Sequence, residues 1–597
     1  MTTPTTFGRE PVTIVELDQD FCTLTYGVAP CEAILGQTGS DKCYNTRRTC
    51  QDSANYDPES LTLRFCKPME RIPVSWGAIP SLVSVSTSPT RINPGGADSS
   101  SGPLGKRATV TITLQDHPDS DFKTDKYVAE RFTGEANADG VGFDPRQRGT
   151  FWAKWIRRNP YYNGRLLRIR DGYLGQALED MRVRHYIIDA VDGPDNSGRV
   201  TVRGTDILRL TDADKAQAPM GSRGELQAAL NDSDVTFDII SATLAEYPET
   251  GTLRINDEVM TYTGRTEMAG VITFTGVTRG TDDTEPDDHD EGDTVQLCLR
   301  YDTEYCWEVA EDLLLNYAGI PSEFIPSADW DTEGLVWLPQ FQVTTLITEP
   351  TAVKELLEEI TLHCMFYLWW DEIDQEVKLK AIKPETGSVD VLNEDANILK
   401  DTQKLTVDPS QRISQLWLYY LPRSPILDMD DGKSFRRLRI NIDSDAESTQ
   451  QYGESRVRKV FSRWLRSDAQ AFNVATRLLN RYRDNPQYLT LRVDAKDRVV
   501  WTGDVVDVQS AFVVDSTGEI RTARWQVVSA EEIVSGETIQ YDLFTPDFHK
   551  PPARIWYYTA EAADDYDAAD DTERSENGYL ADEFGQMSDG STGYPPI

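Results

Sequence analysis

Five of the eight cysteines of this 597-residue chain lie in its first 66 residues. Four of them, Cys22, Cys31, Cys43 and Cys50, fall within 29 residues, and Cys66 makes the number odd. Their spacing is neither that of the C-x2-C pairs of zinc ribbons nor that of the bacterial ferredoxin run. Spacing alone leaves buried thiols, disulfides and a metal site as open alternatives. Two wide loops that each supply two thiolates would bring four ligands to one point, whereas the odd fifth cysteine weakens a framework made only of disulfides.

The other three cysteines, Cys298, Cys306 and Cys364, stand in apolar surroundings. Free cysteine in such surroundings behaves as a small buried hydrophobic residue, and we predict that role for all three. His363 ends an expected helix beside Cys364, and we predict a packed core histidine there rather than a metal ligand.

Acidic residues outnumber basic ones by 99 to 60, so the formal net charge is −39. This balance disfavours duplex DNA or an anionic membrane as a partner gripped from outside, because binding phosphate requires clustered Lys and Arg. No apolar run approaches the roughly 20 residues of a membrane span, and the first residues do not have the pattern of a secretion signal. We therefore expect a large, soluble, acidic protein that is made and folded in a cytoplasm.

Hydrophobic patterning predicts a mixed, mainly β fold with some helices (α+β) and several domains. Residues 108–114 alternate apolar side chains with threonine, the period of a half-buried strand. Helical periodicity predicts helices over 304–317, 351–364 and 467–483, the last with Ser467 as N-cap. The expected segments are a cysteine-rich module at 1–75, the first part of a β-domain at 76–221, a small inserted β-domain at 222–297, an α/β segment at 298–400, a second β-domain at 401–550, and an acidic tail at 551–597.

The paired x8 and x6 spacing of the cysteines, followed by the strand-like Leu61-Thr-Leu-Arg-Phe65, resembles the iron–sulfur domain of the small tail-tip protein of lambda-like phages. In that family four cysteines of this pattern hold a [4Fe–4S] cluster. The resemblance implies that the same cluster is bound here by four thiolates. This chain differs in its extra cysteine, Cys66, and in carrying the module at its start. The residues that the resemblance assigns to the cluster are Cys22, Cys31, Cys43 and Cys50.

Much of the remaining chain resembles the hub proteins of siphophage tail tips and of gene-transfer-agent particles. The motifs that carry this resemblance are Ser84-Val-Ser-Thr-Ser-Pro-Thr90, Ser101-Gly-Pro-Leu-Gly-Lys-Arg-Ala-Thr-Val-Thr111, Tyr452-Gly-Glu-Ser-Arg456 and Arg481-Tyr-Arg-Asp484. The inserted segment matches a small β-module of such tail proteins through Glu258-Val-Met-Thr-Tyr262, Val277-Thr-Arg-Gly280, Thr284 and His289-Asp-Glu-Gly-Asp293. None of these motifs is specific alone, and their order along one chain carries the resemblance.

The resemblance implies a structural virion protein in the tail tip or baseplate. Two β-barrel-like hub domains would repeat in a homotrimeric ring that closes the distal end of the tail tube, adapts its sixfold symmetry to a threefold tip, and forms part of the DNA exit path. The implied partners are the distal tail protein, the tape measure protein and the tail fibre or tip proteins, with indirect contact to the host cell envelope. DNA would pass without specific binding, which an acidic channel would favour by repelling phosphate.

Enzyme motifs are not found in the sequence, and we expect no catalytic residues. Gly105-Lys106 lacks the glycine spacing of a P-loop, and neither G-x-S-x-G nor H-E-x-x-H occurs. Two alternatives remain open: a glycan-binding or glycan-degrading tail component, and an iron–sulfur redox protein. The acidic run at 282–293 lacks the order of an EF-hand loop and is interpreted as a solvated turn.

The last 37 residues, 561–597, hold 11 acidic residues and one Arg. Their charge and low aliphatic content predict a solvated tail that packs no core. The aromatic residues within it leave open a second role, as a peptide that docks on a partner.

Overall fold

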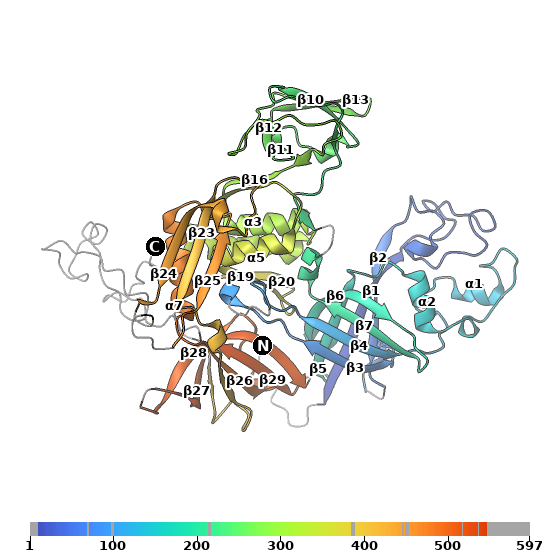
Figure 1. The fold of residues 1–597 in the computed structure, drawn as a ribbon. Helices are drawn as coiled ribbons and strands as arrows, with labels where there is room; N and C mark the ends of the chain where they lie inside the picture. Colours follow the sequence, from blue (N-terminus) through green and yellow to red (C-terminus); the bar gives the residue numbers. More distant parts are fainter. Residues whose placement is uncertain are drawn as a thin grey trace, which may run out of the picture.

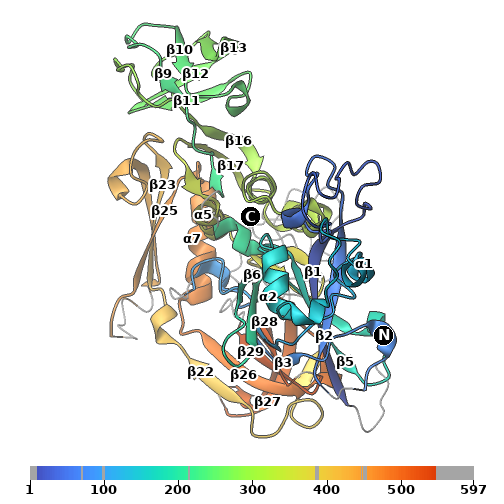
Figure 2. The same ribbon diagram turned by 90° about the vertical axis from the view of Figure 1, so that its right-hand side faces the viewer.

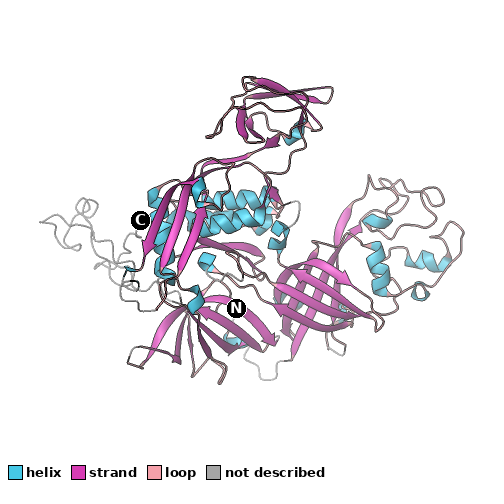
Figure 3. Ribbon diagram, in the orientation of Figure 1, coloured by secondary structure: helices cyan, strands magenta, loops and turns pink. Residues whose placement is uncertain are grey.

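The computed structural model describes residues 10–545, except 69–70, 97–100, 213–215, 384–388, 445–446, 448–452, 516 and 535. Its elements are mainly strands, arranged in several sheets with helices between them (Figures 1 and 3). The predicted mixed, mainly β fold with several domains is thus confirmed. The predicted acidic tail at 551–597 lies outside the described residues. No helix within the described range is long and apolar enough to cross a membrane.

The first domain is a seven-stranded antiparallel sheet whose main core lies on one face. Side chains from all seven strands share a single core with helix α2, so the sheet is barrel-like, although β2 and β3 remain its two edges. Strand β4 shows the predicted alternation, with its apolar residues buried and most of its threonines exposed. In sheet order the strands are β2 (Pro58–Cys66), β1 (Pro11–Cys22), β5 (Leu166–Tyr173), β6 (Arg182–Asp192), β7 (Arg199–Thr205), β4 (Thr109–Gln115) and β3 (Leu82–Ser88), and the helices are α1 (Val128–Thr133) and α2 (Phe151–Arg158).

The expected boundary at residue 75 falls inside this sheet. Strands β1 and β2 pair with each other, and β1 also pairs with β5, so the strands that flank the cysteine loops belong to the first domain. The cysteine-rich composition of residues 1–75 predicted a separate module, and the charged residues of β1 obscure its strand pattern in the sequence. The cysteine loops therefore form one long connection between the paired strands β1 and β2.

The inserted domain has its own core and stands away from the rest of the molecule, at the top of Figures 1 and 2. Its strands lie between residues 225 and 297. It consists of two small sheets, which are β13 (Gly264–Met268), β14 (Val271–Thr275), β10 (Thr236–Ile240) and β9 (Glu225–Leu226), and β12 (Glu258–Tyr262), β11 (Gly251–Ile255) and β15 (Gln296–Leu297).

The central region holds the largest core, built around helices and short pairs of strands. The predicted helix at 304–317 is α3 continued by a single π-helical turn at Leu313–Tyr317, and the predicted helix at 351–364 is α5. Helix α4 was not predicted from the sequence. The elements are α3 (Cys306–Asp312), α4 (Ser327–Trp337), α5 (Val353–His363), and the strand pairs β16 (Leu299–Tyr305) with β17 (Gln342–Ile347), β8 (Gln217–Ala218) with β18 (Thr351–Ala352), and β19 (Phe366–Asp371) with β20 (Glu376–Ala381).

The C-terminal part contains two sheets joined by helix α7 (Asp468–Tyr482). Ser467 caps this helix as predicted, because its hydroxyl accepts a hydrogen bond from the Gln470 amide. A six-stranded sheet has its own core, and a three-stranded sheet packs one face on α7. The strands are β21 (Val391–Asn393), β27 (Val505–Val514), β28 (Ile520–Val534), β29 (Thr538–Phe544), β26 (Gln487–Asp494) and β22 (Lys404–Val407) in the first, and β24 (Phe435–Ile442), β23 (Gln415–Pro422) and β25 (Val457–Ser462) in the second.

The first domain is joined to the C-terminal and central parts by specific contacts. The Ile92 amide donates to the Val528 carbonyl at 2.9 Å. Arg182 on β6 forms an ion pair of 2.9 Å with Glu532 on β28, and both side chains are buried. Through Ile92, the connection between β3 and β4 thus contacts the C-terminal part directly.

Candidate functional site

The four cysteines of the predicted site line one pocket, which we call the cysteine pocket. Cys22 is the last residue of β1, and Cys50 directly follows a short 3₁₀ turn, η1 (Arg47–Thr49). Cys31 and Cys43 lie on the loops between them. The amide of Cys22 donates to the Asn45 carbonyl at 2.7 Å, which draws the second loop back to the end of the strand. This contact helps to bring the four cysteines, which are spread along the connection between β1 and β2, to one pocket.

Two basic side chains from the region of α1 hold these loops in place. Lys126 donates from Nζ to the carbonyl oxygen of Cys22 at 2.6 Å. Arg131 is fully buried and donates from Nη2 to the carbonyl of Cys43 at 3.0 Å, while its Nε contacts Asp125 at 3.1 Å. Lys126 thus places a positive charge close behind Cys22, where anionic sulfur would be stabilised, whereas the charge of Arg131 is balanced by Asp125.

The thiols of the pocket affect one another electrostatically. Burial raises the pKa of Cys43, and the neighbouring Cys50, Cys31 and Cys22 raise it further. The pKa of Cys50 is raised by burial and by Cys22 and Cys31 in the same way. Four thiolates this close repel one another unless a cation shares them, and a metal centre removes that cost by binding the deprotonated sulfur.

All eight cysteines are free thiols, and they are not equivalent. Cys66 lies on β2 and packs in a separate small core with Val12, Ile14 and Met181, away from the cysteine pocket. Within the described part of the chain, no group of three or more His, Cys, Asp or Glu side chains is arranged to hold a metal ion. The four thiols line one pocket, and their role as ligands of a cluster stays a prediction.

The remaining candidate residues follow their predicted structural roles. Cys298, Cys306 and Cys364 are buried, as predicted. His363 is 3% exposed, and burial together with Arg463 and Arg458 lowers its pKa to about 3, so it is a neutral core histidine. In the acidic run at 282–293, Asp282 forms an ion pair of 2.6 Å with Arg300, which fits a charged turn.

Sequence reasoning missed the contribution of residues 121–137 to the site. Tyr127 accepts a hydrogen bond from the Tyr26 amide at 2.7 Å, and Lys42 pairs with Glu130 at 2.5 Å. These partners are about 90 to 100 residues apart in the sequence, and no spacing pattern links them.

No protein-family model and no curated protein matches the chain. Solved structures similar to it are tail proteins of phages and prophages and a gene-transfer-agent particle. A tail protein from Neisseria meningitidis MC58 is 13% identical, with a TM-score of 0.36, over 74% of this chain and 90% of the other. The 43 kDa tail protein of prophage MuSo2 from Shewanella oneidensis is 10% identical, with a TM-score of 0.34, over 78% and 98%. A chain of the virion of a native gene transfer agent particle is 12% identical, with a TM-score of 0.29, over 63% and 81%. TM-scores of this size do not establish a shared overall fold.

Proposed function

We propose that the chain is a structural component of a phage-type tail, located in the tail of the virion as the hub of its tip or baseplate. The observation that carries this proposal is the convergence of four cysteines. The tail-tip resemblance selects Cys22, Cys31, Cys43 and Cys50 and leaves Cys66 out, and the structure lines one pocket with the same four. Neither burial nor spacing alone selects these four from the five.

We further propose that these four cysteines bind a [4Fe–4S] cluster. Bound there, the cluster supplies four iron–thiolate bonds that cross-link the loops. Lys126 offsets part of the negative charge of the thiolate shell, and Arg131 holds the second loop through the carbonyl of Cys43. A small module without a large core gains its stability from such cross-links, so the role proposed for the cluster is structural and not catalytic.

An uncovered apolar face supports a role in assembly. The face of the three-stranded sheet opposite α7 carries Leu438, Ile440 and Ile442, which are 45%, 45% and 48% exposed. Exposed apolar patches of this kind mark protein–protein contact sites. The apolar residues of this outer face are Trp417, Tyr419, Leu438, Ile440, Ile442, Val457 and Phe461, and Lys459 lies among them over the ring of Trp417.

In the proposed assembly three chains form a ring at the distal end of the tail tube. The ring adapts the sixfold tube to a threefold tip, contacts the distal tail, tape measure and fibre proteins, and lets DNA pass during genome delivery. The strong acidic excess supports passage without binding, because like charges repel the phosphate backbone. The proposed function is structural, with no catalytic step.

The test of the cluster is the iron and acid-labile sulfide content of anaerobically purified protein. We expect about four irons per chain, the content of one cubane cluster. Cys22→Ala and Cys43→Ala should lose the iron and its visible absorption, and Cys66→Ala should retain both. Iron-free wild-type protein, or equal loss in Cys66→Ala, would reject the assignment.

A further inference from the structure

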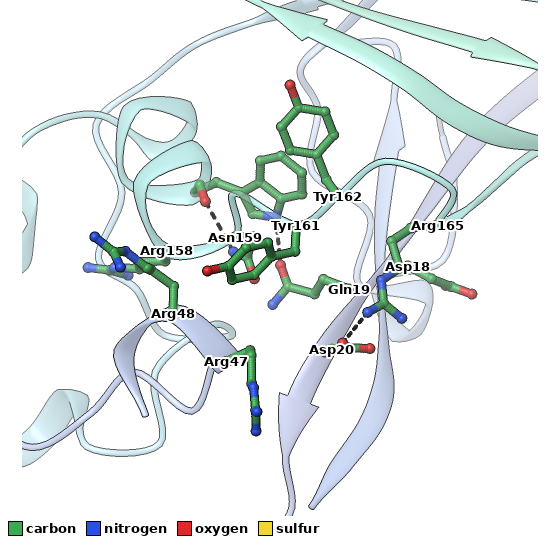
Figure 4. A pocket seen from close by; sticks show the side chains of 11 residues that line it. Asp18, Gln19, Asp20, Arg47, Arg48, Arg158, Asn159, Tyr161, Tyr162 and Arg165 are labelled. Carbon is green, nitrogen blue, oxygen red and sulfur yellow. Dashed lines mark hydrogen bonds and ion pairs between the residues drawn. The ribbon is translucent and has the colours of Figure 1, made fainter. Parts of the chain in front are cut away.

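A second pocket lies beside the cysteine pocket, between the end of β1, η1 and the end of α2 (Figure 4). Arg47, Arg48, Arg158 and Arg165 line it, and we call it the arginine pocket. Four arginines around one pocket are unexpected in a chain whose net charge is −39. The presence of four guanidinium groups around one pocket indicates that this pocket favours an anionic ligand.

The carboxylates that line the arginine pocket already have partners. Asp18 forms an ion pair of 2.6 Å with Arg168, and it also accepts a hydrogen bond from Thr62 at 2.6 Å. Asp20 pairs with Arg165. These two groups are therefore occupied and leave the remaining arginines uncompensated.

Arg47 and Arg48 have no ion-pair partner among the described residues, and Arg47 donates only to the carbonyl of Ser53, at 2.8 Å. Arg158 lies 2.9 Å from Asp121, but Lys154 shares the same carboxylate at 2.7 Å. Two cations thus share one anion on this side, which leaves the arginine pocket with a net positive charge.

Gln19 adds a neutral donor at the inner end of the pocket. Its side chain is 4% exposed, and its Oε1 accepts a hydrogen bond from the indole Nε1 of Trp155 at 2.5 Å. Since an indole N–H can only donate, the amide oxygen must face Trp155 and the amide nitrogen must face away. Figure 4 shows this nitrogen on the side of Gln19 that faces Arg47 and Arg48. This N–H group can donate a hydrogen bond to a ligand in the pocket.

We propose that the arginine pocket binds a carboxylate supplied by an acidic protein segment. Guanidinium groups recognise carboxylate oxygens through paired N–H donors, and the amide of Gln19 supplies a further donor. Duplex DNA requires an extended basic surface, whereas this positive charge is confined to one concave site on an acidic chain. The ligand is therefore a short anionic segment and not an extended polyanion.

The occupant is the acidic segment 561–597 of this same protein, from its own or a neighbouring copy. It offers 11 carboxylates against a single Arg. The 52 residues after position 545 can span at most about 180 Å when extended. This length is sufficient for the segment to reach the pocket of its own chain or that of a neighbouring copy. This proposal concerns a different pocket from the cluster and does not depend on iron being bound.

The test is carbodiimide cross-linking of the full chain carrying Arg48→Lys, read by peptide mass spectrometry. The reagent joins an amine to a carboxylate in contact with it, so the introduced amine reports the occupant of the pocket. We expect cross-links to peptides from 561–597 at least tenfold above those of the matched control Arg157→Lys, an exposed arginine of α2 outside the pocket. At 1 M salt, where the Debye length is about 3 Å, the yield should fall sharply.

Three results would overturn the proposal. The first is cross-linking only to carboxylates of the described range, such as Asp20. The second is equal yield in Arg48→Lys and Arg157→Lys. The third is binding of a duplex DNA fragment by the wild-type protein that is lost in Arg48→Ala. That result would identify nucleic-acid phosphate as the ligand instead.

Discussion

Glu258 is the residue on which the loops of the inserted domain converge. It is 1% exposed and accepts hydrogen bonds from Arg279 at 2.7 Å, from His289 Nε2 at 2.8 Å, and from the amides of Gly280 and Asp287. Burial raises its pKa, but Arg279 and His289 outweigh that effect and hold the pKa below the ordinary 4.5. Three separated motifs of the sequence therefore meet at one buried carboxylate, which gives them a structural role.

Glu258→Gln should destabilise the inserted domain by about 3 kcal/mol, because Arg279 is left buried without its charge partner. Hydrogen exchange of peptides from 222–297 in the full chain should then be about a hundredfold faster, while peptides of the first domain stay unchanged. A lowered pKa in the folded state means that this stability is present above pH 4.5 and is lost as pH falls below it. In Glu258→Gln that acid dependence should be reduced, and unchanged exchange at neutral pH would contradict this role.

Helix α7 shows which elements can be predicted from the sequence. Its apolar stripe, its length and its serine cap all agree with the structure, since local propensity and tertiary packing favour the same result. Strand β1 was missed because Glu16 lies at its centre, 1% exposed between Arg64, Arg168 and Arg170. A buried charge network makes a core strand look like a surface segment, so only tertiary contacts reveal it.

Some residues of the candidate sites could likewise be predicted from the sequence, and others could not. The cysteines could be selected from spacing and resemblance. Lys126, Arg131 and Gln19 could not, because each acts across a contact between residues far apart in the chain. Local patterns identify atoms that bind strongly, but they do not identify the groups that position those atoms.

Ser467→Ala should reduce the stability of the region around α7 by about 1 kcal/mol, since the hydroxyl then no longer accepts the hydrogen bond of the Gln470 amide. Urea unfolding followed by hydrogen exchange of α7 peptides measures this change. Ser467→Asp keeps a capping oxygen and should differ little from wild type. Equal loss in both variants would show that the cap is not the cause.

At the scale of the whole molecule, the outer face of the β23–β25 sheet is the surface that an assembly would cover. It lies at an edge of the molecule in both views (Figures 1 and 2), and Tyr419 and Phe461 stack on it at 4.8 Å. A threefold ring requires a heterologous contact, in which this face meets a different surface of the neighbouring chain. The inserted domain projects from the body and leaves the face accessible.

Ile440→Asp should weaken self-association at least tenfold, because burying an aliphatic side chain of this size contributes about 1.5–3 kcal/mol. Sedimentation velocity across a concentration series measures the effect. Met268→Asp, at an exposed position of the inserted domain, is the matched control and should associate like wild type. Association that is unaffected by Ile440→Asp would exclude the outer face from the contact.

Native mass spectrometry of the anaerobically purified full chain tests the account most directly, because it reads the number of chains and the bound mass together. We predict an assembly of three chains, each heavier than its sequence by one [4Fe–4S] cluster, with the added mass absent in Cys22→Ala. A single chain of unmodified mass would contradict both the hub and the cluster.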